Sequence, residues 1–197
     1  MGLHGTQLPV IIVPGLGGSG PDHWQSHFER SIPAATRLAG IDWNKPDLRE
    51  WTHALCRSVG TRPGCLLVAH SLGCTLIAHV ARQYPNLPVN GAFLVAPADV
   101  DESSDLAANV CTFRAMPRQA LPFPTITVAS RNDPYMRFER AEFFAAGWSS
   151  HLIDAGYAGH INVASGYGPW PEGQQRLSTL AQNLTRTARQ TVHQTID

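Results

Sequence analysis

The stretch "LLVAHSLGCTLIAHVA", Leu66 to Ala81, joins a continuous apolar run to an amphipathic segment through a single serine, Ser71. The apolar run is typical of a strand buried on both faces of a parallel sheet, and the segment after it has helical spacing. Small residues, Ala69 and Gly73, stand two positions before and after the serine. This pattern predicts a sharp strand-to-helix turn that lifts the Ser71 hydroxyl out of the sheet, as a nucleophile requires.

Ser71 has a second interpretation, because serine is a common N-cap residue and could simply accept a hydrogen bond from the first helical turn. Ala69 also replaces the first glycine of the G-x-S-x-G motif, which adds one methyl group at a tight turn. The flanking small residues and the preceding apolar strand favour the nucleophile. In that interpretation the backbone amide of Leu72, at the start of the helix, would point at a developing oxyanion.

Short apolar runs and longer amphipathic segments alternate along the rest of the chain. The segments expected to form strands are Val10–Val13, Thr36–Ile41, Cys65–Ala69, Ala92–Ala96, Thr125–Ala129 and His151–Ala155. The segments expected to form helices are Pro21–Ser31, Asp47–Val59, Gly73–Gln83, Phe138–Ala146 and Gln174–Thr191. This alternation predicts an α/β fold with a doubly wound, mainly parallel sheet of about six strands. The sequence contains no repeat, low-complexity tract or linker, so we expect one domain over residues 1–197.

Composition and charge exclude several classes of function. The 197 residues include 15 basic and 15 acidic ones, so no net charge attracts nucleic acid or an anionic membrane. No apolar stretch approaches the roughly 20 residues that span a bilayer, and the first residues lack the pattern of a secretory signal. The four cysteines contain no C-x-x-C pair, which suits a reducing compartment. We therefore expect a cytoplasmic protein without nucleic-acid or membrane partners.

The residues that follow the strands are the candidates for chemistry, because ligands bind beyond the carboxyl ends of the strands in such sheets. A serine nucleophile needs a base, and the base needs an orienting carboxylate. In α/β-hydrolases these follow the serine in the order acid, then histidine. Of nine histidines, His160 follows the last strand within "AGYAGHINVASG", and we expect it to be the base; the alternative is a surface-loop histidine. His70, beside the serine, is expected to shape the turn or to contact the substrate.

Two aspartates are candidates for the acid. Asp133 ends the fifth expected strand in "VASRNDPY" and precedes Pro134, which fixes the turn, whereas Asp99 ends the fourth in "VAPADV". We favour Asp133, although Asp99 could also reach the site and Asn132–Asp133 could form an ordinary Asx turn. Asp154 lies inside the last strand and is expected to pair locally.

Four motifs, "PGLGGSGPDHWQ", "AHSLG", "SRNDPY" and "GHINVASGYGPWPEG", together resemble the small retinoblastoma-binding-protein-9-like (YdeN-like) serine hydrolases of the α/β-hydrolase superfamily. The resemblance covers most of the chain. It implies a compact fold without a large lid, with Ser71 as nucleophile, Asp133 as acid and His160 as base. It also implies an oxyanion hole made by the backbone amides of Leu16 and Leu72. Some members of this group bind protein partners through L-x-C-x-E; this chain has no such motif, which argues against a retinoblastoma-type partner.

The glycine cluster in "VIIVPGLGGSG", Val10–Gly20, also fits the G-x-G-x-x-G spacing of dinucleotide-binding loops. Asp42 lies about where a ribose-binding acid would stand. Against this interpretation, Pro14 occupies the strand exit and the bulky His23 opens the helix, and a dinucleotide would leave the serine, acid and histidine unexplained. We therefore expect no cofactor, and assign the loop to the oxyanion, with Gly15 as a candidate substrate contact.

Three further features have two interpretations each. His23 and His27 are spaced to share a helical face, but no Glu follows His23 as the zinc motif H-E-x-x-H demands, so we expect no metal. Trp170 could border the substrate pocket or pin the loop behind His160. The connection over residues 100–121, where larger relatives insert a cap, could form a short flap or pack in the core.

These features together predict a serine hydrolase that cleaves a small ester, or a thioester or amide, through an acyl-enzyme intermediate. The short connection over residues 100–121 predicts an accessible pocket and small or short-chain substrates, which suits a carboxylesterase-like enzyme. A serine at the turn argues against dehalogenation, which uses an aspartate there. The alternative from another class is a catalytically weak protein of this fold that binds a protein partner.

Overall fold

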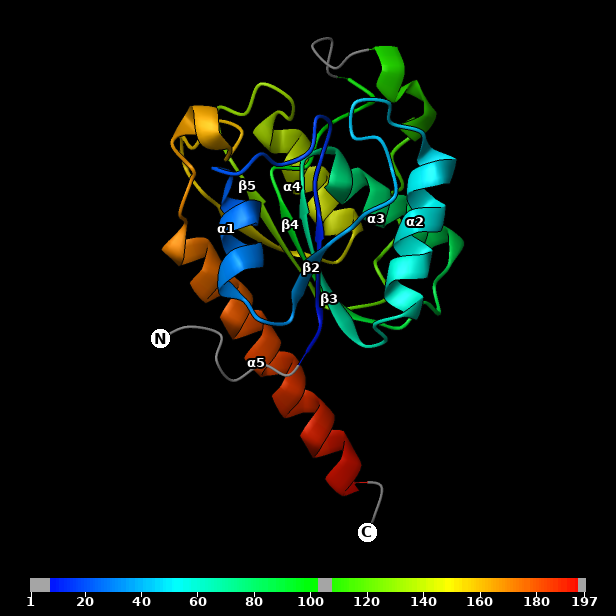
Figure 1. The fold of residues 1–197 in the computed structure, drawn as a ribbon. Coiled ribbons are helices and arrows are strands. Elements are labelled where there is room, and N and C mark those ends of the chain that lie inside the picture. The colour runs from blue at the N-terminus through cyan, green and yellow to red at the C-terminus, as the bar shows by residue number, and fades with distance from the viewer. Residues whose placement is uncertain (1–7, 103–107, 195–197) are drawn as a thin grey trace.

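The structure is a computed structural model that describes residues 8–102 and 108–194. It contains a six-stranded parallel sheet in the order β2-β1-β3-β4-β5-β6 (Figure 1). The strands are β1 (Val10–Val13), β2 (Ala35–Arg37), β3 (Cys65–His70), β4 (Val89–Val95), β5 (Thr125–Ala129) and β6 (His151–Asp154). The predicted doubly wound α/β sheet is confirmed.

Helices cover both faces of this sheet. They are α1 (Trp24–Ser31), α2 (Leu48–Gly60), α3 (Leu72–Gln83), α4 (Phe138–Gly147) and α5 (Pro171–Gln194), with short 3₁₀ turns η1 (Ala108–Phe113) and η2 (Val163–Ser165). Figure 1 shows α1 and α5 together on one side, with α2 and α3 on the other. None of the helices in the described ranges has both the length and the apolar character needed to cross a membrane.

The central strands β1 and β3 are buried on both faces, which explains why their sequences are continuous apolar runs. Successive side chains point to opposite faces. Ile11 and Leu67 therefore pack with the α2, α3 and α4 side chains, while Ile12 and Val68 pack with those of α1 and α5. Full burial of each such side chain stabilises the fold by about 1.5–3 kcal/mol. The centre of the sheet is therefore rigid and fixes the positions of the loops at its carboxyl edge.

Some elements begin or end elsewhere than predicted. β2 ends at Arg37 rather than at Ile41, because the chain turns away at Gly40, which has a φ of +81°. α1 begins at Trp24 rather than Pro21, since the ring of His23 accepts a hydrogen bond from the Gln25 amide and caps the helix there. At the other end of the chain, α5 begins three residues earlier than expected, at Pro171, a residue suited to a first helical position.

The connection from β4 to β5 carries η1 and, in its described part, no large cap. Phe113 is fully buried against Trp51, and its carbonyl accepts a hydrogen bond from the His79 ring at 2.8 Å. Met116 is buried in the same cluster. Of the two predicted alternatives, these side chains pack in the core; residues 103–107 of the connection lie outside the described residues.

Candidate active site

Ser71 lies at the turn between β3 and α3, with φ 55° and ψ −124°. This strained conformation costs about 1–3 kcal/mol and lifts the side chain away from the helix. The N-cap interpretation is not supported, because the Ser71 side chain makes no capping hydrogen bond. The turn also needs a glycine at position 73, since a Cβ on Gly73 would lie 2.6 Å from the Pro14 carbonyl oxygen.

His160 and Asp133 complete a hydrogen-bonded chain with Ser71. The Nε2 atom of His160 lies 2.9 Å from the Ser71 Oγ, and its Nδ1 atom lies 2.9 Å from each carboxylate oxygen of Asp133. The side chain of Asp133 is 2% exposed and that of His160 8%. A neutral His160 that donates from Nδ1 to the carboxylate leaves Nε2 free to accept the serine proton. The three residues therefore meet at the carboxyl edge of the sheet in the geometry of a nucleophile, base and acid.

Asp133 also forms the Asx turn that was an alternative explanation for it. Its Oδ1 accepts a hydrogen bond from the backbone of Tyr135 at 2.8 Å while both oxygens face the His160 ring. The turn and the contact with His160 are therefore compatible, and the turn fixes the carboxylate in place.

Asp99, the rival acid, is committed to a buried ion pair. Its two oxygens lie 2.7 and 3.2 Å from the Arg140 guanidinium, and its Oδ1 also accepts hydrogen bonds from the backbone of Asp101 and Glu102. This contact raises the pKa of Arg140. Asp154 pairs with the neighbouring Arg131 at 2.6 Å, the local pairing that its position in the strand predicts.

Replacing Asp99 with asparagine is expected to destabilise the fold by about 2 kcal/mol without changing the chemistry of Ser71. Breaking a fully buried ion pair costs about 3–5 kcal/mol. The loss expected here is smaller, because Arg140 is partly exposed to solvent and still has Glu102 as an ion-pair partner at 3.3 Å. Urea denaturation measures the change. Arg137→Gln, which breaks an exposed pair with Glu102, is the control and should cost about 0.5 kcal/mol or less. Equal losses in the two variants would contradict a structural role for Asp99.

The backbone around His160 is held at several points by side chains that sequence patterns did not single out. The amides of residues 158, 159 and 160 donate to side-chain oxygens of Ser130, Asn132 and Ser165, at 2.9, 2.7 and 3.1 Å respectively. The indole of Trp24 donates to the carbonyl of Ile161 at 2.9 Å. Because backbone groups are the same in every residue, the only sequence signal for these contacts is the polar character of "SRND" and of the loop itself.

The glycine loop packs directly against the serine turn. A Cβ on Gly15 would lie 2.7 Å from the Ser71 Cβ and 3.1 Å from the Leu72 amide nitrogen. The next residue along this loop is Leu16. Among the described residues, no acceptor binds the backbone N–H of Leu16 or Leu72. Backbone amides without an acceptor, at the start of the helix after the serine and in the adjoining loop, are the groups from which an oxyanion site is built.

Gln25 holds the strands from which this loop and the serine turn emerge. Its fully buried amide donates to the carbonyls of Val13 at 3.2 Å and Val68 at 3.0 Å, and its oxygen accepts from Ser19 at 2.6 Å. Both strand ends and the glycine loop are thereby linked to α1. The sequence does not mark this residue, because a lone glutamine in a helix carries no periodic signal.

The ring of His70 lies beside that of His160, and the ring of His23 lies beside that of His70. The rings of His70 and His160 are 4.7 Å apart between centroids, and His23 is 4.7 Å beyond His70. Burial lowers the pKa of His70 well below its usual value. Burial and the nearby Arg37 lower the pKa of His23 to about 4. Both rings are therefore neutral at ordinary pH.

His23, which was paired with His27 in the zinc interpretation, caps α1 through one of its two ring nitrogens. In the described ranges, no group of three or more His, Cys, Asp or Glu side chains is placed to hold a metal ion. The Nδ1 atom of His23 accepts the Gln25 amide at 3.2 Å, which occupies it in helix capping.

Trp170 stands just before α5, in an aromatic cluster with α1. Its ring lies 5.4 Å from that of Trp24 and 6.4 Å from that of Phe28, and the residue is 8% exposed. Trp24 in turn bonds the loop of His160. These are the contacts of a side chain that pins this loop from behind, the second of its two predicted alternatives.

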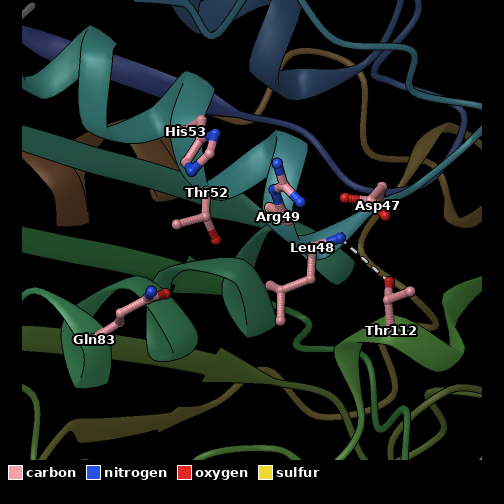
Figure 2. Close-up of a pocket in the computed structure, with 7 residues that line it drawn as sticks. All are labelled: Asp47, Leu48, Arg49, Thr52, His53, Gln83 and Thr112. Carbon is pink, nitrogen blue, oxygen red and sulfur yellow. Dashed lines mark hydrogen bonds between the residues drawn. The ribbon is translucent and has the colours of Figure 1, made fainter.

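A separate hollow of about 310 Å³ lies between the first turns of α2 and the last residue of α3 (Figure 2). It is lined by Asp47, Leu48, Arg49, Thr52, His53, Gln83 and Thr112. Gln83 is the last residue of α3, about 18 Å along the helix from the serine turn. The Asp47 carboxylate caps α2, and the Thr112 hydroxyl accepts the Leu48 amide at 3.2 Å, as the dashed line in Figure 2 shows. This hollow is therefore distinct from the site around Ser71.

The chain is similar to several known proteins. A family model described as serine hydrolase matches residues 10–179. A YdeN-like hydrolase of Pectobacterium atrosepticum is 38% identical, with a TM-score of 0.79 over 90% of this chain and 92% of that one. The ydeN gene product of B. subtilis is 21% identical, with a TM-score of 0.67 over 88% and 98%.

A structure from a study of carboxylesterases of Nitrososphaera gargenis is 13% identical, with a TM-score of 0.65 over 91% of this chain and 92% of that one. At 21% and 13% identity, the Bacillus and Nitrososphaera structures show a shared fold alone. No curated protein sequence matches the chain.

Proposed function

The chain belongs to the serine hydrolase family, and we propose that it hydrolyses small carboxylic esters through Ser71, His160 and Asp133. The observation that carries this proposal is the unbroken chain of 2.9 Å contacts from the serine hydroxyl through the imidazole to the carboxylate. In such sites a buried aspartate holds the histidine in the tautomer with its proton on Nδ1, and it stabilises the imidazolium that forms during the reaction.

The reaction begins when the Ser71 hydroxyl attacks the ester carbonyl and His160 takes its proton at Nε2. The carbonyl oxygen becomes an oxyanion, which accepts hydrogen bonds from the Leu16 and Leu72 amides. His160 then returns the proton to the leaving alcohol, and an acyl-enzyme remains on Ser71. Water activated by the same ring attacks this acyl group, releases the acid and restores the serine.

Small esters are the substrate class that the fold supports best. The connection from β4 to β5 packs Phe113 and Met116 into the core in its described part, so no large cap encloses a long acyl chain. One of the fold neighbours comes from a study of carboxylesterases. We further propose that the enzyme acts in the cytoplasm, since all four cysteines are free.

A fluorophosphonate probe combined with an ester panel tests this function. We expect mass spectrometry to locate the adduct on Ser71, and p-nitrophenyl acetate and butyrate to be hydrolysed faster than long-chain esters. Folded protein that neither reacts with the probe nor cleaves any ester would contradict the proposal and favour the protein-binding alternative.

Changing Gly15 to alanine tests the oxyanion site. The proposed donors there are backbone amides, so they cannot be removed by deleting a side chain. The added Cβ would lie 2.7 Å from the Ser71 Cβ and push the loop that carries Leu16 away from the serine. We expect kcat to fall about 100-fold, the usual cost of losing one oxyanion donor. Gly20→Ala is the matched control, because a Cβ there meets nothing within 4 Å. Similar kinetics for the two variants would count against this oxyanion site.

A further inference from the structure

Two adjacent residues of the serine turn contact His160 at different atoms. The Ser71 hydroxyl lies 2.9 Å from the ring Nε2, and the Nε2 atom of His70 lies 2.9 Å from the backbone carbonyl oxygen of His160. His70 is the last residue of the buried strand β3, and Ser71 is the residue after it. One turn therefore contacts the backbone as well as the ring of a residue about 90 positions later in the chain.

The backbone of His160 needs such support. Gly159 precedes it with a φ of +56°, and Ile161 follows it with a φ of +46°. A β-branched residue at positive φ is strained, at a cost of about 1–3 kcal/mol, and keeps this conformation only where surrounding contacts impose it. Most of the contacts described above come from the strand exit that carries the acid or from the loop itself. Among these contacts with the backbone, the one from His70 comes from the turn that carries Ser71.

The chemical state of His70 suits this contact. A carbonyl can only accept, so Nε2 of His70 carries the hydrogen and donates it. The residue is 6% exposed, and its burial lowers the pKa, so the ring stays neutral. A neutral ring 4.7 Å from His160 does not oppose the positive charge that forms on the base during the reaction.

We propose that His70 is a positioning residue that sets the His160 ring over Ser71 by holding the His160 carbonyl. This inference rests on the proposed function and replaces the expectation that His70 contacts the substrate. It predicts that residue 70 must be a neutral hydrogen-bond donor whose nitrogen lies as far from the backbone as the Nε2 atom of histidine. The side-chain amide nitrogen of glutamine lies at that distance from the backbone. The amide nitrogen of asparagine lies nearer to the backbone, and leucine has no donor.

The test compares His70→Gln, His70→Asn and His70→Leu in ester hydrolysis and in the rate of fluorophosphonate labelling. A misplacement of about 1 Å can cost about 100-fold in rate, so we expect kcat and the labelling rate to fall about 100-fold in the leucine and asparagine variants. KM should stay close to that of the parent protein, and glutamine should restore most of the activity. In proton NMR, the downfield signal of the His160 Nδ1–H should weaken in the leucine variant and persist in the glutamine variant.

Three results would overturn the inference. One is parent-like kcat in His70→Leu, and another is an equal loss in the glutamine and asparagine variants. The third is a raised KM with unchanged kcat, which would make His70 a substrate contact. If His70→Leu does not fold, the comparison of glutamine with asparagine decides, because the two differ only in reach. Failure of the proposed function gives a different pattern, in which the parent protein itself is not labelled at Ser71.

Discussion

Replacing Ser71 with alanine is expected to lower kcat for ester hydrolysis by about a million-fold and to abolish fluorophosphonate labelling. The hydroxyl supplies the atom that bonds to the acyl carbon, and no neighbouring group can replace it. His160 would keep its contact with Asp133, so the site would retain a base without a nucleophile. Initial rates with p-nitrophenyl acetate and intact-protein mass spectrometry measure the two effects.

The fold should survive this substitution, because alanine keeps the Cβ and removes only the hydroxyl oxygen. Ser178→Ala is a suitable control, since that serine is also buried but lies in α5, away from the site. It should be labelled and should turn over substrate like the parent protein. Persistent labelling of Ser71→Ala would mean that another residue is the nucleophile, and would remove the basis of the proposed mechanism.

The sequence predicts the sheet and the edge that carries the site because these depend on local patterns. Continuous apolar runs predict β1 and β3, and the small residues around Ser71 predict the turn that the structure shows at φ 55°. Asp133 lies in the loop that follows β5 and His160 in the loop that follows β6, which predicts that their side chains lie at the same edge as the serine. The structure brings all three within hydrogen-bonding distance.

Other features of the site depend on contacts between distant residues and leave no local pattern. Asp99 and Asp133 both follow strands, and what separates them is Arg140 in α4, which pairs with Asp99 from 41 positions away. The bonds that hold the His160 backbone are likewise made by side chains from other elements, such as His70 and Ser130. Burial decides these contacts, and burial is a property of the assembled fold.

Replacing Asp133 with asparagine is the second change of large effect, and we expect it to lower kcat about 10,000-fold. Asparagine has the size of aspartate and can still accept the Tyr135 amide that closes the turn. Its neutral amide, however, neither stabilises an imidazolium nor enforces the tautomer with a proton on Nδ1. The wrong tautomer places a proton on Nε2 of His160, which then cannot accept the proton of Ser71.

Asp99→Asn is the matched comparison, because it makes the same chemical change in the rival aspartate. Its kcat, corrected for the folded fraction, should equal that of the parent protein while its resistance to urea falls. Asp133→Asn should show the opposite pattern, with nearly normal stability and very slow turnover, since its partner His160 can remain neutral and buried. If instead Asp99→Asn abolishes turnover and Asp133→Asn does not, then the ion pair with Arg140 must open during catalysis and Asp99 is the acid.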